Sequence, residues 1–342
     1  MKTQSPKQNV LITGANGFLG RYVVKALADV DEFIVTALVR DRHRLNGIDR
    51  YPVEIAEGDL SDRAFVETLL QNKAIIVHLA ASTVGTPMAM FANTVNTTEN
   101  LFRIIEQHRL PIRRFVFVSS LAVYDLASTA FRSLIDEDSP LESQWPRRDP
   151  YSIAKFWQER AVREKCEQLN IPFVILRPGA IYGHGGNLLS NRVLLRIPGM
   201  PFGLQIGRRT IVPVTYVENC AEAIKLATLK NEVVNETFNI IDDDMPTQTL
   251  YLRLYEKYFG RAIRKIYIPY RLFRFSCLFF EYLTCRSKGN FPEIFSRYRV
   301  DAIWKPHRYT NRKLKSVLGW QPDYTLEEAF ARIQKLQQNA AA

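Results

Sequence analysis

A phenol and an ammonium group stand four residues apart at Tyr151 and Lys155, in the sequence YSIAK. In a helix, this spacing puts both side chains on one face. A neighbouring cation stabilises a phenolate and lowers the pKa of tyrosine from its usual value of about 10. We therefore predict that Tyr151 is a general acid/base near neutral pH. Tyr309 and Lys313 have the same spacing, but they lie in a basic stretch that is typical of a solvated helix face.

Two serines, Ser119 and Ser120, follow the apolar run Phe115–Val118. A serine hydroxyl at the end of a strand can hydrogen-bond a substrate oxygen and orient it toward Tyr151. Serines at strand ends also commonly satisfy local backbone groups. We favour Ser120 over Ser119 as the catalytic hydroxyl, and the second assignment remains an alternative.

A glycine-rich loop, TGANGFLG, spans residues 13–20 between an apolar run and a stretch with helical spacing. Gly14 allows a tight turn, Gly17 lets the backbone approach a diphosphate, and Gly20 lets the helix pack closely on the strand. The phosphates would lie on the N–H groups at the start of the helix. The loop therefore predicts a dinucleotide site, with contacts from Gly14, Asn16, Gly17, Phe18, Leu19 and Gly20.

Arg40 stands twenty residues after Gly20, where an acidic residue would bind the adenosine ribose of a dinucleotide. A carboxylate there favours NAD, whereas a guanidinium can bind a 2′-phosphate bidentately. Arg40, supported by Arg42 or Arg44, therefore predicts NADP as the cofactor. Asp41 is adjacent, and a shift of one residue would restore NAD, which remains the alternative.

Strands and helices alternate along the first half of the chain. Strands are expected at Asn9–Thr13, Phe33–Val39, Val53–Ala56, Ala74–Leu79, Phe115–Val118 and Phe173–Leu176, and helices at Phe18–Ala28, Asp62–Gln71, Val95–His108 and Tyr151–Leu169. This alternation implies right-handed crossovers and a parallel sheet, and strands that are apolar throughout imply a sheet covered on both faces. We predict an α/β fold, a Rossmann-type doubly wound sheet with a smaller, mostly helical C-terminal substrate lobe. The NAD(P)-binding domain is expected at 1–180 and 211–243, and the lobe at 181–210 and 244–342.

The composition excludes several classes of protein. Of the 342 residues, 46% are hydrophobic and 24% charged, which argues against disorder, collagen and coiled coil. The four cysteines and five histidines lack the spacing of a metal site or a disulfide framework, so we predict no metal and reduced thiols. The N-terminus has no apolar stretch, and no run of about 18 apolar residues occurs. We expect a cytoplasmic protein, with association at the periphery of a membrane left open.

Seven segments resemble, in order, the extended short-chain dehydrogenase/reductase superfamily and in particular its NAD-dependent epimerase/dehydratase family. They are TGANGFLG, GDLSD, VHLAAS, VSSLAVY, YSIAK, LRPGAIYG and VPVTYVENCAEA. The resemblance runs from about Asn9 to Ile241 and continues more weakly to LGWQPDYTLEEA, Leu318–Ala329. It implies hydride transfer between a nicotinamide and a secondary alcohol or ketone, on a small-molecule substrate.

The resemblance also implies roles for single residues. Ser120, Tyr151 and Lys155 would form the catalytic triad, and Lys155 would also bind the nicotinamide ribose. Besides the glycine loop and Arg40, further cofactor contacts are predicted. Asp59 and Leu60 would lie near the adenine, and Pro178 would lie beside the nicotinamide. The other predicted contacts are Leu79, Ala80, Ala81, Ser119, Tyr151 and Lys155.

Departures from the family pattern narrow the reaction. Dehydratases of this family usually carry an acidic pair where Leu121 and Ala122 stand here, so dehydration lacks its acid and base. Many sugar-nucleotide epimerases carry an asparagine at the position of Ala180, and the segment LRPGAIYG looks more like the hydroxysteroid-dehydrogenase branch. We favour an oxidoreductase for a hydroxysteroid-like or other apolar substrate. The alternatives are a nucleotide-sugar 4-epimerase or reductase, and a non-catalytic NAD(P)-binding sensor.

The basic charge of the chain lies in one C-terminal segment. Residues 261–315 hold 14 Lys/Arg and three Asp/Glu, a net charge of +11 that equals that of the whole chain. Within them, Pro269–Cys285 has the pattern of a helix with a narrow polar stripe. It could pack on the core or on a second subunit in a homodimer, or form a lid that rests on an anionic membrane surface. Alternatively, one of the arginines at 297, 299 and 308 could grip a substrate phosphate. Nucleic-acid binding is not predicted, because no recognised module is present.

Overall fold

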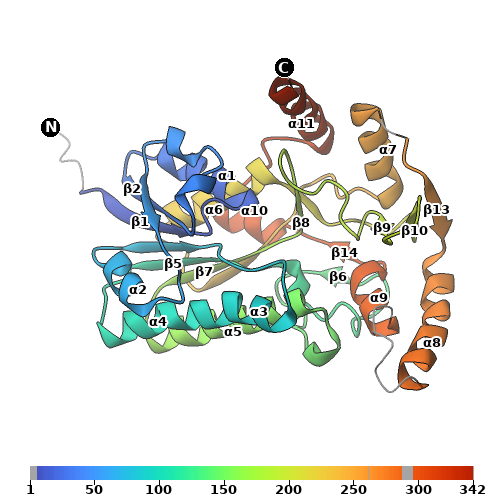
Figure 1. The fold of residues 1–342 in the computed structure, drawn as a ribbon, viewed down its shortest axis with the longest axis horizontal. Helices are drawn as coiled ribbons and strands as arrows, with labels where there is room; N and C mark the ends of the chain where they lie inside the picture. Colours follow the sequence, from blue (N-terminus) through green and yellow to red (C-terminus); the bar gives the residue numbers. More distant parts are fainter. Residues whose placement is uncertain (1–5, 261, 287–295, 342) are drawn as a thin grey trace.

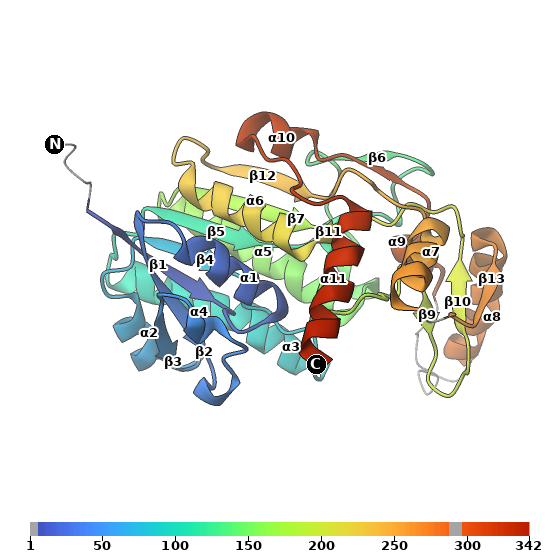
Figure 2. The ribbon, with the colours of Figure 1, turned by 90° about the horizontal axis from the view of Figure 1, so that it is seen from above.

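Seven parallel strands form the main sheet, in the order β12-β7-β5-β4-β1-β2-β3 (Figures 1 and 2). The computed structural model describes residues 6–260, 262–286 and 296–341. The strands of this sheet are β1 (Gln8–Thr13), β2 (Phe33–Val39), β3 (Glu54–Glu57), β4 (Ile75–His78), β5 (Arg114–Val118), β7 (Phe173–Pro178) and β12 (Glu236–Ile240). The chain runs from β1 outward to β3 and then crosses to β4 on the other side of β1. This order confirms the predicted Rossmann-type doubly wound sheet, with its switch point between β1 and β4.

Helices cover both faces of the sheet (Figures 1 and 2). One face is covered by α1 (Phe18–Ala28), α6 (Val217–Leu229) and α10 (Arg312–Leu318), and the other by α2 (Arg63–Leu70), α4 (Thr97–Gln107) and α5 (Pro150–Gln168). The short helix α3 (Pro87–Phe91) leads into α4 through one π-helical turn. β5 is buried along its whole length, as expected for an apolar strand with helices on both sides.

A smaller lobe follows the sheet and contains α7 (Gln248–Phe259), α8 (Tyr270–Arg286) and α9 (Arg297–Trp304). It also holds a three-stranded sheet of β9 (Leu195–Arg196), β10 (Gly203–Ile206) and β13 (Lys265–Ile268), in the order β13-β10-β9. Figures 1 and 2 show these elements at one end of the molecule, with α8 outermost. The helix predicted at Pro269–Cys285 corresponds to α8. The sequence did not predict β9, β10 and β13.

Short pairings connect the lobe to the main sheet. β8 (Ala180–Tyr182) pairs with β11 (Val214–Tyr216), and β6 (Leu134–Ile135) pairs with β14 (Arg308–Tyr309). The last helix, α11 (Leu326–Ala341), packs against α7. α10 contributes Leu314 and Leu318 to the core under the main sheet. The predicted division of the chain into two domains stays a prediction. Among the helices within the described ranges, none has both the length and the apolarity to cross a bilayer.

Candidate active site and cofactor cleft

A cleft of about 870 Å³ opens at the carboxyl ends of the parallel strands and extends to the lobe. Every residue that the sequence predicts to contact the cofactor or to take part in catalysis lines it, from Gly14 to Pro178. In doubly wound folds, ligands bind at this edge of the sheet. The fold therefore brings the predicted residues together in one site, while the role of each residue stays a prediction.

The loop between β1 and α1 packs too closely to accommodate side chains at two of its glycines. Gly14 has a φ of +69°, and a Cβ there would lie 3.0 Å from the backbone nitrogen of Ala80. A Cβ on Gly20 would lie 2.1 Å from the carbonyl oxygen of Gly14. Gly17 is the N-cap of α1 and offers no side chain to the N–H groups of the first turn. This cradle of backbone fits the diphosphate of a dinucleotide.

The three arginines after β2 have different surroundings. Arg40 is exposed and lines the cleft, whereas Arg42 and Arg44 do not line it. Arg42 faces Glu57 at 3.8 Å, and Arg44 faces Asp41 at 3.5 Å. The expected support of Arg40 by Arg42 or Arg44 is therefore wrong, because nearby carboxylates engage both side chains. The argument for a 2′-phosphate depends on Arg40 alone.

Asp59 lies in the cleft beside Arg40. Burial acts to raise the pKa of its carboxyl group, but hydrogen bonds from Ser61 and the positive charge of Arg40 outweigh this effect and lower the pKa. The Ser61 N–H donates to Asp59 Oδ1 at 2.8 Å. Asp59 is therefore an ionised acceptor at the end where the adenine is predicted.

Tyr151 lies in the first turn of α5, which begins at Pro150. Asp149 caps this helix, since its Oδ1 accepts from the Ser152 N–H at 3.0 Å. Pro at the first helical position is favoured there because its fixed φ suits a helix. The cap and the proline together fix the direction in which Tyr151 enters the cleft.

The two candidate serines have different partners. Ser119 is buried, and its hydroxyl donates to Glu159 Oε2 at 2.5 Å. Ser120 lines the cleft together with Tyr151, where it acts to lower the pKa of that phenol, and it accepts from the Ala122 N–H at 3.1 Å. Successive side chains of a strand point to opposite faces, which separates the two hydroxyls. The geometry favours Ser120 as the partner of Tyr151.

Lys155 is buried under the cleft floor. Its Nζ donates to the Val118 carbonyl at 2.7 Å and to Gln158 Oε1 at 2.6 Å, and it lies 4.5 Å from the centre of the Phe117 ring. Burial lowers the pKa of Lys155 to about 7, although the charge of Glu159 opposes this shift. Protein groups, and not solvent, therefore accept these hydrogen bonds of the Lys155 ammonium.

The expectation that Lys155 lowers the pKa of Tyr151 is wrong in this structure. Burial raises the pKa of Tyr151 above its usual value, and the hydrogen bond with Ser120 opposes this shift only in part. The negative charge of Asp149 raises the pKa further. The ammonium of Lys155 is desolvated and bound to Val118 and Gln158. Because the pKa of Tyr151 is raised, the neutral phenol is its stable form near neutral pH.

Two buried groups behind the catalytic residues were not found from the sequence. Arg177 donates to Glu159 through Nη2 at 2.5 Å and through Nε at 3.1 Å, and both side chains are almost fully buried. Glu159 follows Lys155 by one helical turn on α5, and this spacing could have indicated it. The pair fills the space between α5 and β7 and supports Ser119.

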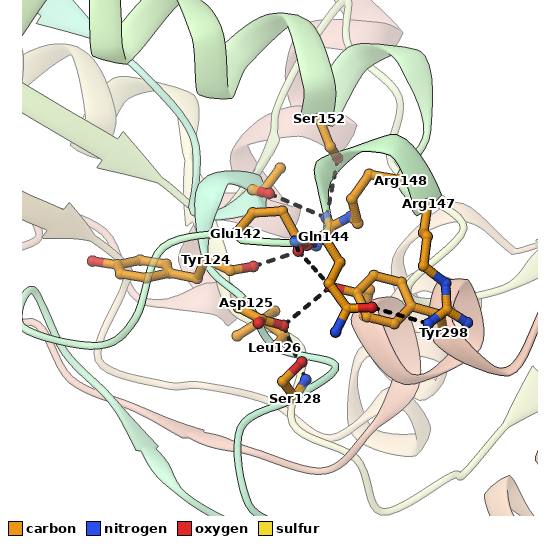
Figure 3. Close-up of polar contacts among 12 residues, drawn as sticks. Tyr124, Asp125, Leu126, Ser128, Glu142, Gln144, Arg147, Arg148, Ser152 and Tyr298 are labelled. Atoms are coloured by element: carbon orange, nitrogen blue, oxygen red, sulfur yellow. Dashed lines mark hydrogen bonds and ion pairs between the residues drawn. The ribbon is translucent and has the colours of Figure 1, made fainter.

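A second buried arginine, Arg148, lies directly before the cap of α5 and lines the cleft (Figure 3). Its guanidinium donates to Glu142 at 2.9 Å, to the Ala122 carbonyl at 3.1 Å and to Ser152 Oγ at 3.1 Å. Arg148 therefore ties the turn after Ser120 to the first turn of α5, which carries Tyr151.

The lobe reaches the same network through α9 (Figure 3). The hydroxyl of Tyr298 donates to Glu142, and it lies 3.2 Å from Asp125 Oδ1. Glu142 is 3% exposed and Arg148 4% exposed, so the ion pair lies in the protein interior. Tyr298 is 156 residues away from Glu142 in the sequence, and no sequence pattern connects the two.

The end of the cleft beyond Tyr151 is of mixed polarity. Its lining includes Ser82, Thr83, Leu121, Ala122, Asn187, Ser190, Asn191, Arg192, Pro213 and Ile303. Arg192 donates to the backbone carbonyls of Ile303 at 3.0 Å and Ala302 at 3.3 Å. Among the described residues, no carboxylate forms an ion pair with Arg192, and the buried hydroxyl of Ser190 has no hydrogen-bond partner. A substrate would meet these groups.

The chain is similar to known proteins along nearly its whole length. A family model for the NAD dependent epimerase/dehydratase family matches residues 10–240. UDP-glucose 4-epimerase of Vibrio cholerae is 23% identical over 336 residues, which cover 94% of this chain and 93% of that protein. A decarboxylating sterol-4-alpha-carboxylate 3-dehydrogenase of Candida albicans is 26% identical over 352 residues, covering 94% of this chain and 95% of that protein.

Solved structures share the fold. UDP-glucose 4-epimerase of Thermotoga maritima with UDP-glucose has a TM-score of 0.72 and 19% identity, covering 98% of this chain and all of that chain. UDP-glucuronic acid 4-epimerase of Bacillus cereus in complex with NAD has a TM-score of 0.73 and 17% identity, with the same coverage. At these identities, the likeness concerns the arrangement of the elements.

Proposed function

The chain belongs to the NAD-dependent epimerase/dehydratase family and is an NAD(P)-dependent enzyme, and we propose that it transfers hydride between the nicotinamide and a secondary alcohol or ketone. The observation that carries this proposal is that Ser120, Tyr151 and Lys155 line the same cleft as the glycine cradle. Bound NAD(P) supplies or accepts the hydride.

The residues of the chain handle the proton. Ser120 holds the substrate oxygen, and Tyr151 exchanges a proton with it. Because burial raises the pKa of Tyr151, its phenol carries the proton near neutral pH. This state donates a proton to a ketone oxygen during reduction, and the same oxygen of Tyr151 takes the proton of an alcohol in the reverse reaction. Lys155 would bind the nicotinamide ribose from the floor of the cleft.

We propose NADP as the preferred cofactor and an apolar, hydroxysteroid-like molecule as the substrate. Arg40 supports the first proposal, because it lines the cleft where a 2′-phosphate would lie. Leu121, Pro213 and Ile303 at the substrate end support the second. Leu121 and Ala122 also stand where a dehydratase would need acidic side chains.

A nucleotide-sugar 4-epimerase is the second candidate. The observation that favours it is Arg192, a cation at the substrate end that has no carboxylate partner among the described residues and could bind a diphosphate. An epimerase returns hydride to its own intermediate and should purify with tightly held cofactor. A reductase should release its cofactor and consume added NADPH.

The substitution Tyr151→Phe tests the proposal. Loss of the proton donor should reduce turnover of a ketone substrate by about 100-fold or more, while NADPH binding, followed by nucleotide fluorescence, should persist. Full turnover by Tyr151→Phe would refute the assignment. If Tyr151→Phe lost turnover but kept the function of the protein in the cell, the alternative of a non-catalytic sensor would be correct.

A further inference from the structure

Helix α8 has two apolar faces, and the lobe uses one of them. Tyr270, Phe273 and Cys277 are buried against α9 and β10. The Phe273 and Trp304 rings meet edge to face, with their centres 5.8 Å apart. Arg274 also binds Asp301 of α9 at 2.8 Å. The inner face therefore packs α8 against the lobe.

The outer face of α8 exposes large apolar side chains, which are Leu272, Phe275, Leu278, Phe279 and Tyr282, with exposed fractions of 59%, 68%, 39%, 61% and 55%. At about 100° per residue, they share one stripe opposite the inner face. Single exposed apolar residues are common on proteins, but a contiguous stripe of this size indicates a binding surface.

Positive charges flank this stripe. Arg271 precedes it and Arg286 follows it on the same side of the helix, and both are exposed. Arg286 donates to the Tyr282 hydroxyl at 2.6 Å. The acidic residue of α8, Glu281, is turned toward Arg297, which it binds at 2.8 Å. The outer stripe thus combines aromatic and aliphatic side chains with cations.

A groove of about 430 Å³ lies beside the stripe. Its lining residues are Phe131, Tyr270, Arg271, Arg274, Phe275, Leu278, Arg297, Asp301 and Lys305. Four of these are cations and one is a carboxylate; Arg274 is paired with Asp301 and Arg297 with Glu281, which leaves Arg271 and Lys305 without a carboxylate partner among the described residues. The groove is therefore positive at one side and apolar where Phe275 and Leu278 line it, as an anionic amphiphile requires.

We propose that the outer stripe of α8 docks on an anionic lipid bilayer, and that the groove receives a lipid headgroup phosphate. The apolar stripe would enter the boundary between headgroups and acyl chains, and the flanking arginines would meet the anionic lipid. Within α8 itself, Arg271, Arg274 and Arg286 stand against one acidic residue, Glu281, and this positive balance is complementary to such a surface. The lobe would then face the bilayer, while the main sheet would face water.

Vesicle co-sedimentation of the whole protein tests this proposal. Wild-type protein should bind vesicles of phosphatidylcholine mixed with phosphatidylserine, bind pure phosphatidylcholine more weakly, and dissociate as salt is raised. The double variant Arg271→Gln/Arg286→Gln should lower the partition coefficient about 25-fold, since each arginine near an anionic surface contributes about a factor of five. Phe275→Ser/Phe279→Ser should abolish binding to both kinds of vesicle.

Matched variants control for the general effect of surface changes. Leu250→Ser/Val317→Ser alters apolar side chains that are 45% and 41% exposed on α7 and α10. Arg253→Gln/Arg312→Gln removes two exposed arginines from the same two helices. Both should bind vesicles as the wild type does. All variants should unfold at the wild-type temperature, because the substituted side chains are exposed.

Three outcomes would overturn the proposal. The first is wild-type protein that does not bind the anionic vesicles. The second is an equal loss of binding in the control variants. The third is that the wild type sediments as a dimer, whereas Phe275→Ser/Phe279→Ser sediments as a monomer and binds vesicles as before. This result would assign the stripe to contact with a second copy of the chain.

Discussion

The buried pair of Arg148 and Glu142 gives a prediction whose size follows from the structure. Glu142→Gln keeps the shape of the side chain and removes its charge. Arg148 would remain 4% exposed, with carbonyl and hydroxyl acceptors but without a carboxylate. Breaking a buried ion pair from one side costs about 3–5 kcal/mol. We expect the free energy of unfolding to fall by about that amount.

An exposed ion pair provides the matched control. Arg160 and Glu164 lie 2.7 Å apart on the outer side of α5, and both side chains are more than half exposed. Glu164→Gln removes the same chemical group and should cost about 0.3–0.5 kcal/mol. Urea unfolding, followed by circular dichroism, measures both variants under one condition. An effect of Glu142→Gln no larger than that of Glu164→Gln would refute the assignment of Glu142 as the counter-charge of Arg148.

A double variant separates stability from catalysis. Arg148→Met/Glu142→Leu replaces the ion pair with apolar side chains of similar volume, and such replacements often restore stability. It also removes the donors that hold the Ala122 carbonyl and Ser152. We therefore expect unfolding near that of the wild type together with a lower kcat. If the double variant kept the full kcat, Arg148 would have no part in positioning Tyr151.

Two further predictions concern the cleft. Arg40→Ala should weaken NADPH binding about 10-fold or more and NADH binding much less, because a hydrogen bond to a charged phosphate contributes about 1.5–3 kcal/mol. Fluorescence titration measures both affinities, and equal losses would show that Arg40 does not bind a 2′-phosphate. Ser120→Ala should lower kcat with little change in stability. Ser119→Ala should lower the free energy of unfolding by about 1–3 kcal/mol, since Glu159 loses a buried donor. Steady-state kinetics and urea unfolding measure the two effects, and the reverse pattern would exchange the roles of the two serines.

The sheet and the cofactor cleft could be predicted because their determinants are local in the sequence. Apolar runs define the strands, and the loops at their carboxyl ends necessarily meet at one edge. The observed β2 has the predicted bounds, and β4 differs by one residue at each end. The glycine loop is contiguous, so its tight turn follows from a single segment.

The surroundings of the catalytic groups could not be predicted, because they depend on contacts across the sequence. The pKa of Tyr151 depends on its burial, and the position of the Lys155 ammonium depends on its hydrogen bond to the Val118 carbonyl. Arg42 is taken up by Glu57 of the neighbouring strand. None of these contacts has a sequence motif, since each depends on the register and depth of packed elements.

Helix α9 connects the proposed docking surface with the catalytic residues. On one side, Asp301 of α9 binds Arg274 of α8, directly under the exposed stripe. On the other side, Tyr298 of α9 donates to Glu142, which binds Arg148 beside the cap of α5. Three consecutive contacts therefore lead from the α8 surface to the arginine next to Tyr151. Because the same helix contacts both ends, its position would set the orientation of the open end of the cleft relative to the proposed bilayer.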